Sequence, residues 1–218
     1  MASKKPARAG KIAARAEPVE APAVKKPAGR HLTGKPAGEV RIIGGQWKRS
    51  KLPVADKPGL RPTPDRVRET LFNWLGQDLT GWSCVDAFAG TGALGFEAAS
   101  RGAKAVSLVE QDTALVAQLR KIKEQLQAAA VQVQRGDGIA ALKAWPPASA
   151  DLVFLDPPFD AQLFEPALQA AALALAPGGY IYLEAPSAWS AEQLAPLGLI
   201  PYRHLKAGAV HAHLLQRN

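Results

Sequence analysis

The segment Asp156-Pro157-Pro158-Phe159 combines residues that could hold a planar base carrying an exocyclic amine. Each proline fixes its φ angle and lacks an N–H, so backbone carbonyls beside the carboxylate remain free acceptors. Asp156 and the Pro157 carbonyl can accept hydrogen bonds from the amine, and the Phe159 ring can stack on the base. These contacts would prepare the nitrogen to attack an electrophile. Asp-Pro-Pro is also ordinary turn chemistry, so further residues must support this interpretation.

A glycine-rich turn predicts a nucleoside-containing cofactor. Gly90, Gly92 and Gly95 satisfy the pattern G-x-G-x-x-G, which lets backbone approach a ligand at the start of a helix. Glu110, at the end of the next predicted strand, could bind ribose hydroxyls. A nicotinamide dehydrogenase would show the same features. The turn residues that we assign to the cofactor are Ala89, Gly90, Thr91 and Gly92.

Three acidic residues favour S-adenosylmethionine as this cofactor. Asp86 precedes the first glycine by four residues, where its carboxylate can serve the amino-acid end of the ligand. Asp137 could accept from the adenine amine, and Asp156 completes a set of acids around a cationic sulfonium. A dinucleotide carries two negatively charged phosphates, which these carboxylates would not stabilise. The competing interpretation is that Asp86 and Asp137 only cap helices or turns.

The elements that must position these residues form an α/β pattern. The run Leu152–Leu155 suits a strand buried on both faces of a parallel sheet, whose carboxyl edge binds ligands. Short β-rich runs alternate with helical stretches, and the last two strands must pair antiparallel because no helix fits between them. Strands are predicted at 83–88, 105–110, 131–135, 152–156, 180–184, 202–205 and 210–216. Helices are predicted at 93–100, 113–127, 139–144 and 163–175.

Residues 40–54 predict a basic hairpin around Gly44-Gly45. Cationic side chains and an aromatic ring suit phosphate contact and base stacking. A solvated edge whose lysines block strand addition would look similar. The candidate RNA-binding residues are Arg41, Trp47, Lys48, Arg49 and Lys51.

A proline-rich loop at residues 59–64 leads into a predicted helix over 66–75, with Asp65 as its N-cap. Apolar residues recur along this segment with helical spacing. Arg61, Arg66 and Arg68 could face a phosphate or a cofactor carboxylate. Arginines that point into solvent would give the same pattern.

Charge is unevenly distributed along the 218 residues. Residues 1–38 hold nine Lys or Arg and two Glu, residues 39–68 hold eight basic and three acidic residues, and the remainder is mildly acidic. This distribution indicates a polyanion that approaches from one side. The first 38 residues lack hydrophobic periodicity and predict a disordered basic tail, which either tethers RNA or only aids solubility. The tail has no apolar signal region, and the single cysteine, Cys84, fits a reducing cytoplasm.

Taken together, the motifs DAFAGTGALGFEAASRGA, VEQD, RGDG and DLVFLDPPF, with RIIGGQWKRSKLPV and GLRPTPDRVRETLFNWL, resemble the bacterial 16S ribosomal RNA guanine-N2 methyltransferase family. That family modifies guanine 966 in the numbering of the RNA, and the resemblance covers about residues 40–218. Pro64 stands where the family usually has a second Thr, and the C-terminal third matches only in outline.

The resemblance implies a Rossmann-like class I methyltransferase fold, a seven-stranded and mostly parallel sheet with one antiparallel strand. It implies a hairpin extension at 39–60, a methyltransferase domain at 61–218, and a loop near the cofactor that contains Thr63 and Arg66. It also implies 16S ribosomal RNA within a small subunit or assembly intermediate as the partner, and a monomeric enzyme. We expect no metal, because the sulfonium of the cofactor already makes its methyl group electrophilic.

Three alternatives remain open from the sequence. One is an adenine-N6 or other amino methyltransferase acting on DNA or another RNA, although such enzymes more often have Asn in place of Asp156. The second is a nicotinamide-dependent reductase, which would explain the glycine turn but would give the Asp156–Phe159 motif no role. The third is a non-catalytic RNA-binding assembly factor. His211 and His213 share a strand face, but with no third ligand they predict no metal site.

Overall fold

The computed structural model describes residues 38–57, 60–159 and 162–218. Apart from Gly38, the predicted basic tail lies outside these residues, as does Gly59 of the proline-rich loop. None of the described helices is long and apolar enough to cross a membrane.

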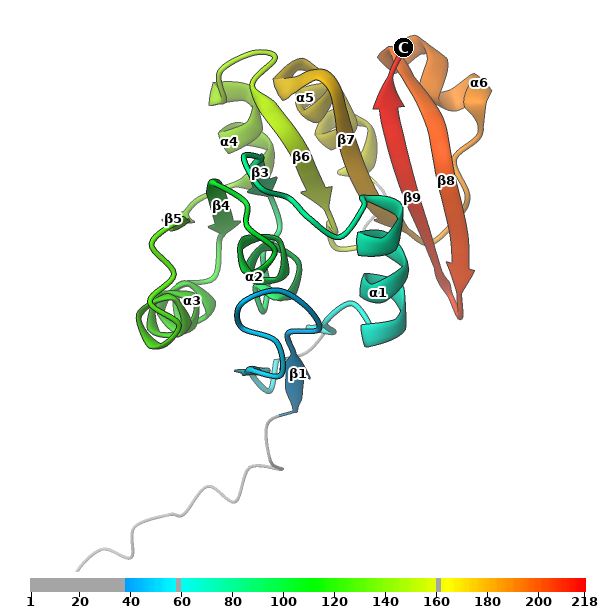
Figure 1. Ribbon diagram of the computed structural model, residues 1–218. Helices are drawn as coiled ribbons and strands as arrows, with labels where there is room; N and C mark the ends of the chain where they lie inside the picture. Colours follow the sequence, from blue (N-terminus) through cyan, green and yellow to red (C-terminus); the bar gives the residue numbers. More distant parts are fainter. Residues whose placement is uncertain (1–37, 58–59, 160–161) are drawn as a thin grey trace, which may run out of the picture. The chain divides into compact units, whose positions relative to one another are not determined.

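A seven-stranded sheet with the order β5-β4-β3-β6-β7-β9-β8 organises the described residues (Figure 1). Strand β9 pairs antiparallel with both β7 and β8, whereas all other neighbours pair parallel. The predicted Rossmann-like fold with one antiparallel strand is therefore confirmed. The strands are β3 (Ser83–Asp86), β4 (Ala105–Glu110), β5 (Val131–Arg135), β6 (Ala150–Leu155), β7 (Leu175–Ala185), β8 (Leu199–Ala207) and β9 (Val210–Arg217).

Strand β6 shows why the sheet must be covered on both faces. Leu152 and Phe154 pack into one hydrophobic cluster, and Val153 and Leu155 pack into a second. Helices α1, α2 and α3 contribute to the first cluster, and α4, α5 and α6 contribute to the second. Successive side chains of a strand point to opposite faces, so a fully apolar run requires a helical layer on each side. The helices are α1 (Asp65–Trp74), α2 (Ala93–Ser100), α3 (Thr113–Gln125), α4 (Gly138–Ala144), α5 (Phe164–Ala174) and α6 (Ala191–Leu194).

Element boundaries differ from the predictions mainly near the C-terminal half of the sheet. Strand β7 begins at Leu175, so it extends five residues before the predicted start and shortens α5. The short helix α6 and the 3₁₀ turn η1 (Ala195–Leu197) were not predicted. Ser190 and Gln193 form a capping box at the start of α6, a pattern that the sequence does contain.

The predicted N-terminal hairpin is confirmed. Strands β1 (Glu39–Arg41) and β2 (Lys51–Pro53) pair antiparallel, apart from the main sheet. Val40, Ile42 and Leu52 are buried in the same hydrophobic cluster as α1 and α2. The hairpin therefore shares the core of the main sheet on the face covered by α1 to α3.

Candidate active site

Four acidic side chains come from the carboxyl ends of neighbouring parallel strands. Asp86 ends β3, Glu110 ends β4, Asp156 follows β6 and Glu184 lies one residue before the end of β7. Parallel pairing aligns Asp86 with Phe154, and Leu155 with Leu183, so the acids meet at one sheet edge. This is the edge where open α/β sheets bind ligands.

Asp86 is the most deeply buried of the acids predicted to serve the cofactor. Its Oδ2 accepts a hydrogen bond from the backbone N–H of Gly95 at 3.1 Å. Burial raises the pKa of Asp86 to about 7; backbone hydrogen bonds oppose this rise, whereas the charges of Glu110 and Glu184 add to it. A cationic ligand at this edge would favour the ionised carboxylate.

We expect Asp86→Asn to change how stability depends on pH. The pKa of Asp86 is higher in the folded state than in the unfolded state, where it is near 4, so the protonated group stabilises the fold fully below about pH 4. This stabilisation is lost as the pH rises through about 7. From pH 5 to pH 8 the free energy of unfolding of the wild type should therefore fall by about 2 to 3 kcal/mol more than that of the variant. Chemical unfolding of both ligand-free proteins at the two pH values measures this difference. Parallel pH dependences would contradict a raised pKa at Asp86.

The glycine turn adopts backbone conformations that other residues rarely take. Gly90 and Gly92 have φ angles of 50° and 77°, and Gly92 is the N-cap residue of α2. Glu110 accepts from the Gly90 N–H at 2.9 Å and from the Asp112 N–H at 2.8 Å, so it connects the turn to the next strand. Ala89 and Thr91, the other predicted turn residues, are buried.

Gly95 serves packing rather than ligand approach. A Cβ atom there would lie 2.1 Å from Cδ2 of Leu108 on β4. The third glycine therefore allows α2 to pack closely on the sheet, as expected for this pattern.

Asp137 lies in the turn between β5 and α4 and is exposed. It is the N-cap of α4, with Oδ1 accepting from the Ala140 N–H at 2.7 Å, and Oδ2 accepts from Gln111 Nε2 at 2.8 Å. The capping interpretation therefore holds for Asp137, and a contact with an adenine amine remains a prediction.

The Asp156–Phe159 segment leaves the sheet between β6 and α5. Pro157 is buried, Asp156 is partly buried, and the Phe159 side chain is 45% exposed. Burial, together with the charges of Glu184 and Asp86, raises the pKa of Asp156 well above its usual range. The segment thus presents a carboxyl group beside an accessible aromatic ring.

Glu184 is a candidate functional residue that sequence reasoning missed. Its Oε1 accepts from the Thr63 hydroxyl at 2.5 Å and from the Tyr182 hydroxyl at 2.9 Å. Thr63, predicted to bind cofactor, is thus buried and directed at Glu184, while Arg61 and Arg66 are exposed. The available signal was an acid at the end of a buried strand, the same pattern that identified Asp156.

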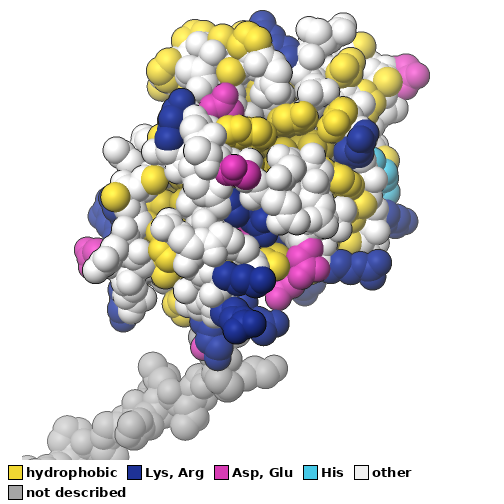
Figure 2. Space-filling model, in the orientation of Figure 1, with side chains coloured by type: hydrophobic (Ala, Val, Ile, Leu, Met, Phe, Trp, Pro, Cys, Tyr) yellow, Lys and Arg dark blue, Asp and Glu magenta, His cyan; other side chains and the backbone are white. Residues whose placement is uncertain are grey.

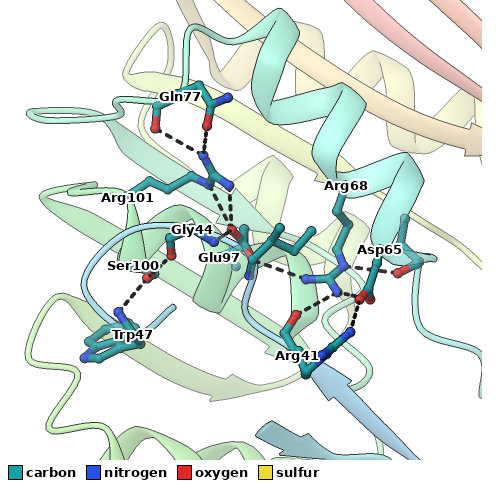
Figure 3. A network of polar contacts seen from close by, with 12 residues as sticks. Arg41, Gly44, Trp47, Asp65, Arg68, Gln77, Glu97, Ser100 and Arg101 are labelled. Carbon is teal, nitrogen blue, oxygen red and sulfur yellow. Dashed lines mark hydrogen bonds and ion pairs between the residues drawn. The ribbon is translucent and has the colours of Figure 1, made fainter. Parts of the chain in front are cut away.

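The prediction that Arg68 faces a phosphate or cofactor is wrong. Its side chain is fully buried and pairs with Glu97 at 3.2 Å and with Asp65 at 2.7 Å (Figure 3). The prediction that Asp65 is an N-cap is also wrong, because Pro64 occupies that position and Asp65 lies in the first turn. A buried guanidinium needs anionic partners, and the Asp65 carboxylate is one of the two that Arg68 has.

Glu97 joins the N-terminal loop to α2. Its carboxylate accepts from the backbone N–H groups of Ile43 at 2.7 Å and Gly44 at 2.8 Å, and it also pairs with Arg68 and Arg101 (Figure 3). Beyond these contacts, the Ser100 hydroxyl donates to the Gly44 carbonyl at 2.6 Å. The loop between β1 and β2 is therefore held in a defined place against α2.

The predicted RNA-binding residues lie on this anchored loop and its strands. Lys48 and Arg49 are exposed, and within the described residues neither forms an ion pair. Arg41 pairs with Asp65 at 3.7 Å and Lys51 with Glu39 at 2.7 Å, whereas Trp47 is partly buried against the core. Figure 2 shows Lys and Arg side chains gathered at the hairpin end of this face, with acidic side chains among them.

The histidine pair on β9 has a third neighbour on β8. His204 Nε2 lies 3.0 Å from His211 Nδ1, and the His204 and His213 rings are 4.7 Å apart. Within the described ranges, no group of three or more His, Cys, Asp or Glu side chains is arranged to hold a metal ion. Cys84 is buried, which raises the pKa of its thiol and fits a core residue.

Comparison with known proteins places residues 40–216 in the family described as conserved hypothetical protein 95. A relative named ribosomal RNA small subunit methyltransferase D, from Escherichia coli K12, is 42% identical over 178 residues, covering 77% of this chain and 89% of the relative. The protein of that name from Haemophilus influenzae is 41% identical, with coverages of 76% and 93%. The solved structure of a putative methyltransferase from Escherichia coli matches with a TM-score of 0.70 and 38% identity, over 83% of this chain and 98% of that one.

Proposed function

The chain belongs to the family of the small-subunit ribosomal RNA methyltransferases D, and from this premise we propose that it methylates the exocyclic N2 of a guanine in 16S ribosomal RNA, with S-adenosylmethionine as methyl donor. The family resemblance makes guanine 966 the proposed target. The observation that carries the proposal is the position of Asp156-Pro157-Pro158-Phe159 at the carboxyl edge of β6, beside the buried carboxyls of Asp86 and Glu184.

The residues at this edge fit S-adenosylmethionine. The turn from Ala89 to Gly92 brings backbone to the start of α2, and a Cβ at Gly90 would meet only a Leu60 side-chain atom at 3.2 Å and the Phe88 carbonyl at 4.0 Å. The buried carboxyls of Asp86 and Glu184, whose pKa values are raised, suit a cationic ligand better than a phosphorylated one. We propose that Asp86 and the turn bind its amino-acid end, Glu110 its ribose and Asp137 its adenine, with Thr63 and Arg66 in the covering loop. When bound, the cofactor supplies a methyl group that its sulfonium charge already makes electrophilic.

The chain's own residues orient the base and accept its proton. Asp156 and the Pro157 carbonyl accept hydrogen bonds from the amine and direct its lone pair toward the methyl group, while Phe159 stacks on the base. Pro158 keeps the segment rigid. The base must leave its helix to reach this site. Asp156 is the nearest acceptor for the proton that nitrogen loses, and its raised pKa favours that role.

We propose a division of labour along the chain. Residues 61–218 form the catalytic domain, the hairpin of residues 39–60 contacts RNA near the target, and the basic tail of residues 1–38 adds affinity for RNA. The excess of Lys and Arg before residue 69 supports this division. We further propose a monomeric enzyme that acts in the cytoplasm on a small subunit or an assembly intermediate.

The test of the proposed function is transfer of labelled methyl groups to small-subunit particles from cells that lack this protein. We expect N2-methylguanosine after digestion of the RNA to nucleosides. Methyl groups on adenine, or on DNA alone, would instead support the amino methyltransferase alternative, and no transfer to nucleic acid would refute the proposal.

We expect the combined changes Lys48→Gln and Arg49→Asn to weaken binding of the particle without impairing the chemical step. Asn tolerates the positive φ angle of 75° at position 49. The KM for particles should rise about 10-fold at low salt while kcat stays unchanged, and the difference should shrink at high salt because phosphate contacts are screened. Steady-state kinetics at two salt concentrations measure this effect.

Lys143→Gln is the matched control for the loop variant, because Lys143 is an exposed lysine on α4, which packs in the cluster on the other face of the sheet. It should leave KM unchanged. An unchanged KM in the loop variant would remove the hairpin from the RNA interface.

A further inference from the structure

Glu184 and Asp156 are neighbours at the edge that holds the candidate active site. Leu155 of β6 pairs in parallel with Leu183 of β7, so the two acids are the next residues on adjacent strands. Adjacent strands lie about 4.8 Å apart. Two carboxyl groups are therefore available at a spacing that one base edge can span.

The two oxygens of Glu184 have different surroundings. Oε1 accepts two hydroxyl hydrogen bonds, from Thr63 and Tyr182. Oε2 has no hydrogen bond to another described residue. Glu184 thus has one acceptor oxygen that the described residues leave for a donor of the ligand.

Guanine carries two adjacent donors on its Watson–Crick edge, the N2 amine and N1–H. Adenine carries an amine beside an unprotonated N1, which would face a carboxylate oxygen without a hydrogen between them. We propose that Glu184 accepts a hydrogen bond from N1–H of the target base while Asp156 accepts from the N2 amine, and that Glu184 thereby selects guanine. This inference rests on the proposed function and names the residue that determines its base specificity.

Electrostatics support the placement of two acids here. Burial raises the pKa of Glu184, and the charge of Glu184 contributes to the raised pKa of Asp156. Such a pair is unfavourable without partners, and Thr63 and Tyr182 satisfy only one oxygen of Glu184. A base that offers two parallel donors supplies the missing partners, whereas a base that lacks the second donor leaves the second oxygen of Glu184 without a hydrogen bond.

The test replaces the target guanosine in reconstituted small-subunit particles by 2-aminopurine, which keeps the 2-amino group but has an unprotonated N1. In Glu184→Gln, the amide oxygen should take the place of Oε1 beside Thr63 and Tyr182, leaving the NH2 group toward the base. We expect kcat/KM of this variant to fall about 100-fold on guanosine and less than 5-fold on 2-aminopurine. An equal loss on both bases would overturn the inference.

Thr63→Val is the matched control, because it removes a hydroxyl partner of Glu184 and keeps the carboxylate. It should change the rates on both bases by the same factor. If Glu184→Gln does not fold, as judged by circular dichroism, the wild type decides the question. It should methylate 7-deazaguanosine, which retains N1–H, about 100 times faster than 2-aminopurine, and equal rates would overturn the inference. Failure of the wild type on guanosine itself would instead refute the proposed function.

Discussion

Asp156→Asn is expected to lower the rate of methyl transfer to small-subunit particles by about 1,000-fold while leaving S-adenosylmethionine binding within a few-fold of the wild type. The amide keeps the size of the side chain and one acceptor oxygen, so the base can still enter. It removes the charge that directs the amine and the basic oxygen that takes the proton. The loss should therefore appear in kcat more than in KM. Single-turnover transfer of labelled methyl groups, with cofactor binding measured by calorimetry, separates these contributions.

Asp151→Asn is the matched control for this variant, because Asp151 lies near the opposite end of the same strand. Its Oδ2 accepts from the Ser83 N–H at 2.7 Å, which an amide oxygen can also do. Activity of this variant should remain near that of the wild type. Wild-type activity in Asp156→Asn would show that the motif binds the base without taking part in the reaction.

Glu97→Ala is expected to destabilise the protein by about 3 to 5 kcal/mol, because it leaves two buried arginines without their shared counter-ion. Arg68 is fully buried, Arg101 is nearly so, and Glu97 pairs with both at 3.2 Å and 2.8 Å. The change also leaves the Ile43 and Gly44 N–H groups without their acceptor. Denaturant unfolding monitored by circular dichroism measures the loss. Limited proteolysis should cut the loop between β1 and β2 earlier in the variant than in the wild type.

Glu69→Ala is the control for the loss of a glutamate from a helix, because Glu69 is exposed on α1 beside Arg68. It should change stability by less than about 0.5 kcal/mol. A similarly small effect for Glu97→Ala would show that the loop and the two arginines do not depend on this carboxylate.

Local signals in the sequence were sufficient for the fold and for much of the candidate site. The strand before Asp156 and the glycine turn after Asp86 are short segments whose residue types determine their conformation. Helix α2 was predicted at its observed bounds, since Gly92 ends the turn and the apolar run ends at Ser100. Parallel pairing then brings the acids to one edge, because consecutive strands of an α/β sheet run in the same direction.

Only the tertiary structure decided which polar residues pair across the chain. Thr63 and Glu184 are 121 residues apart, and Ile43 and Glu97 are 54 apart, so no periodicity or spacing rule connects them. For the same reason, Arg68 resembled the exposed arginines around it until its burial against Glu97 was visible. Sequence patterns record what each segment prefers, whereas the partner of a buried charge depends on which distant segments the core brings together.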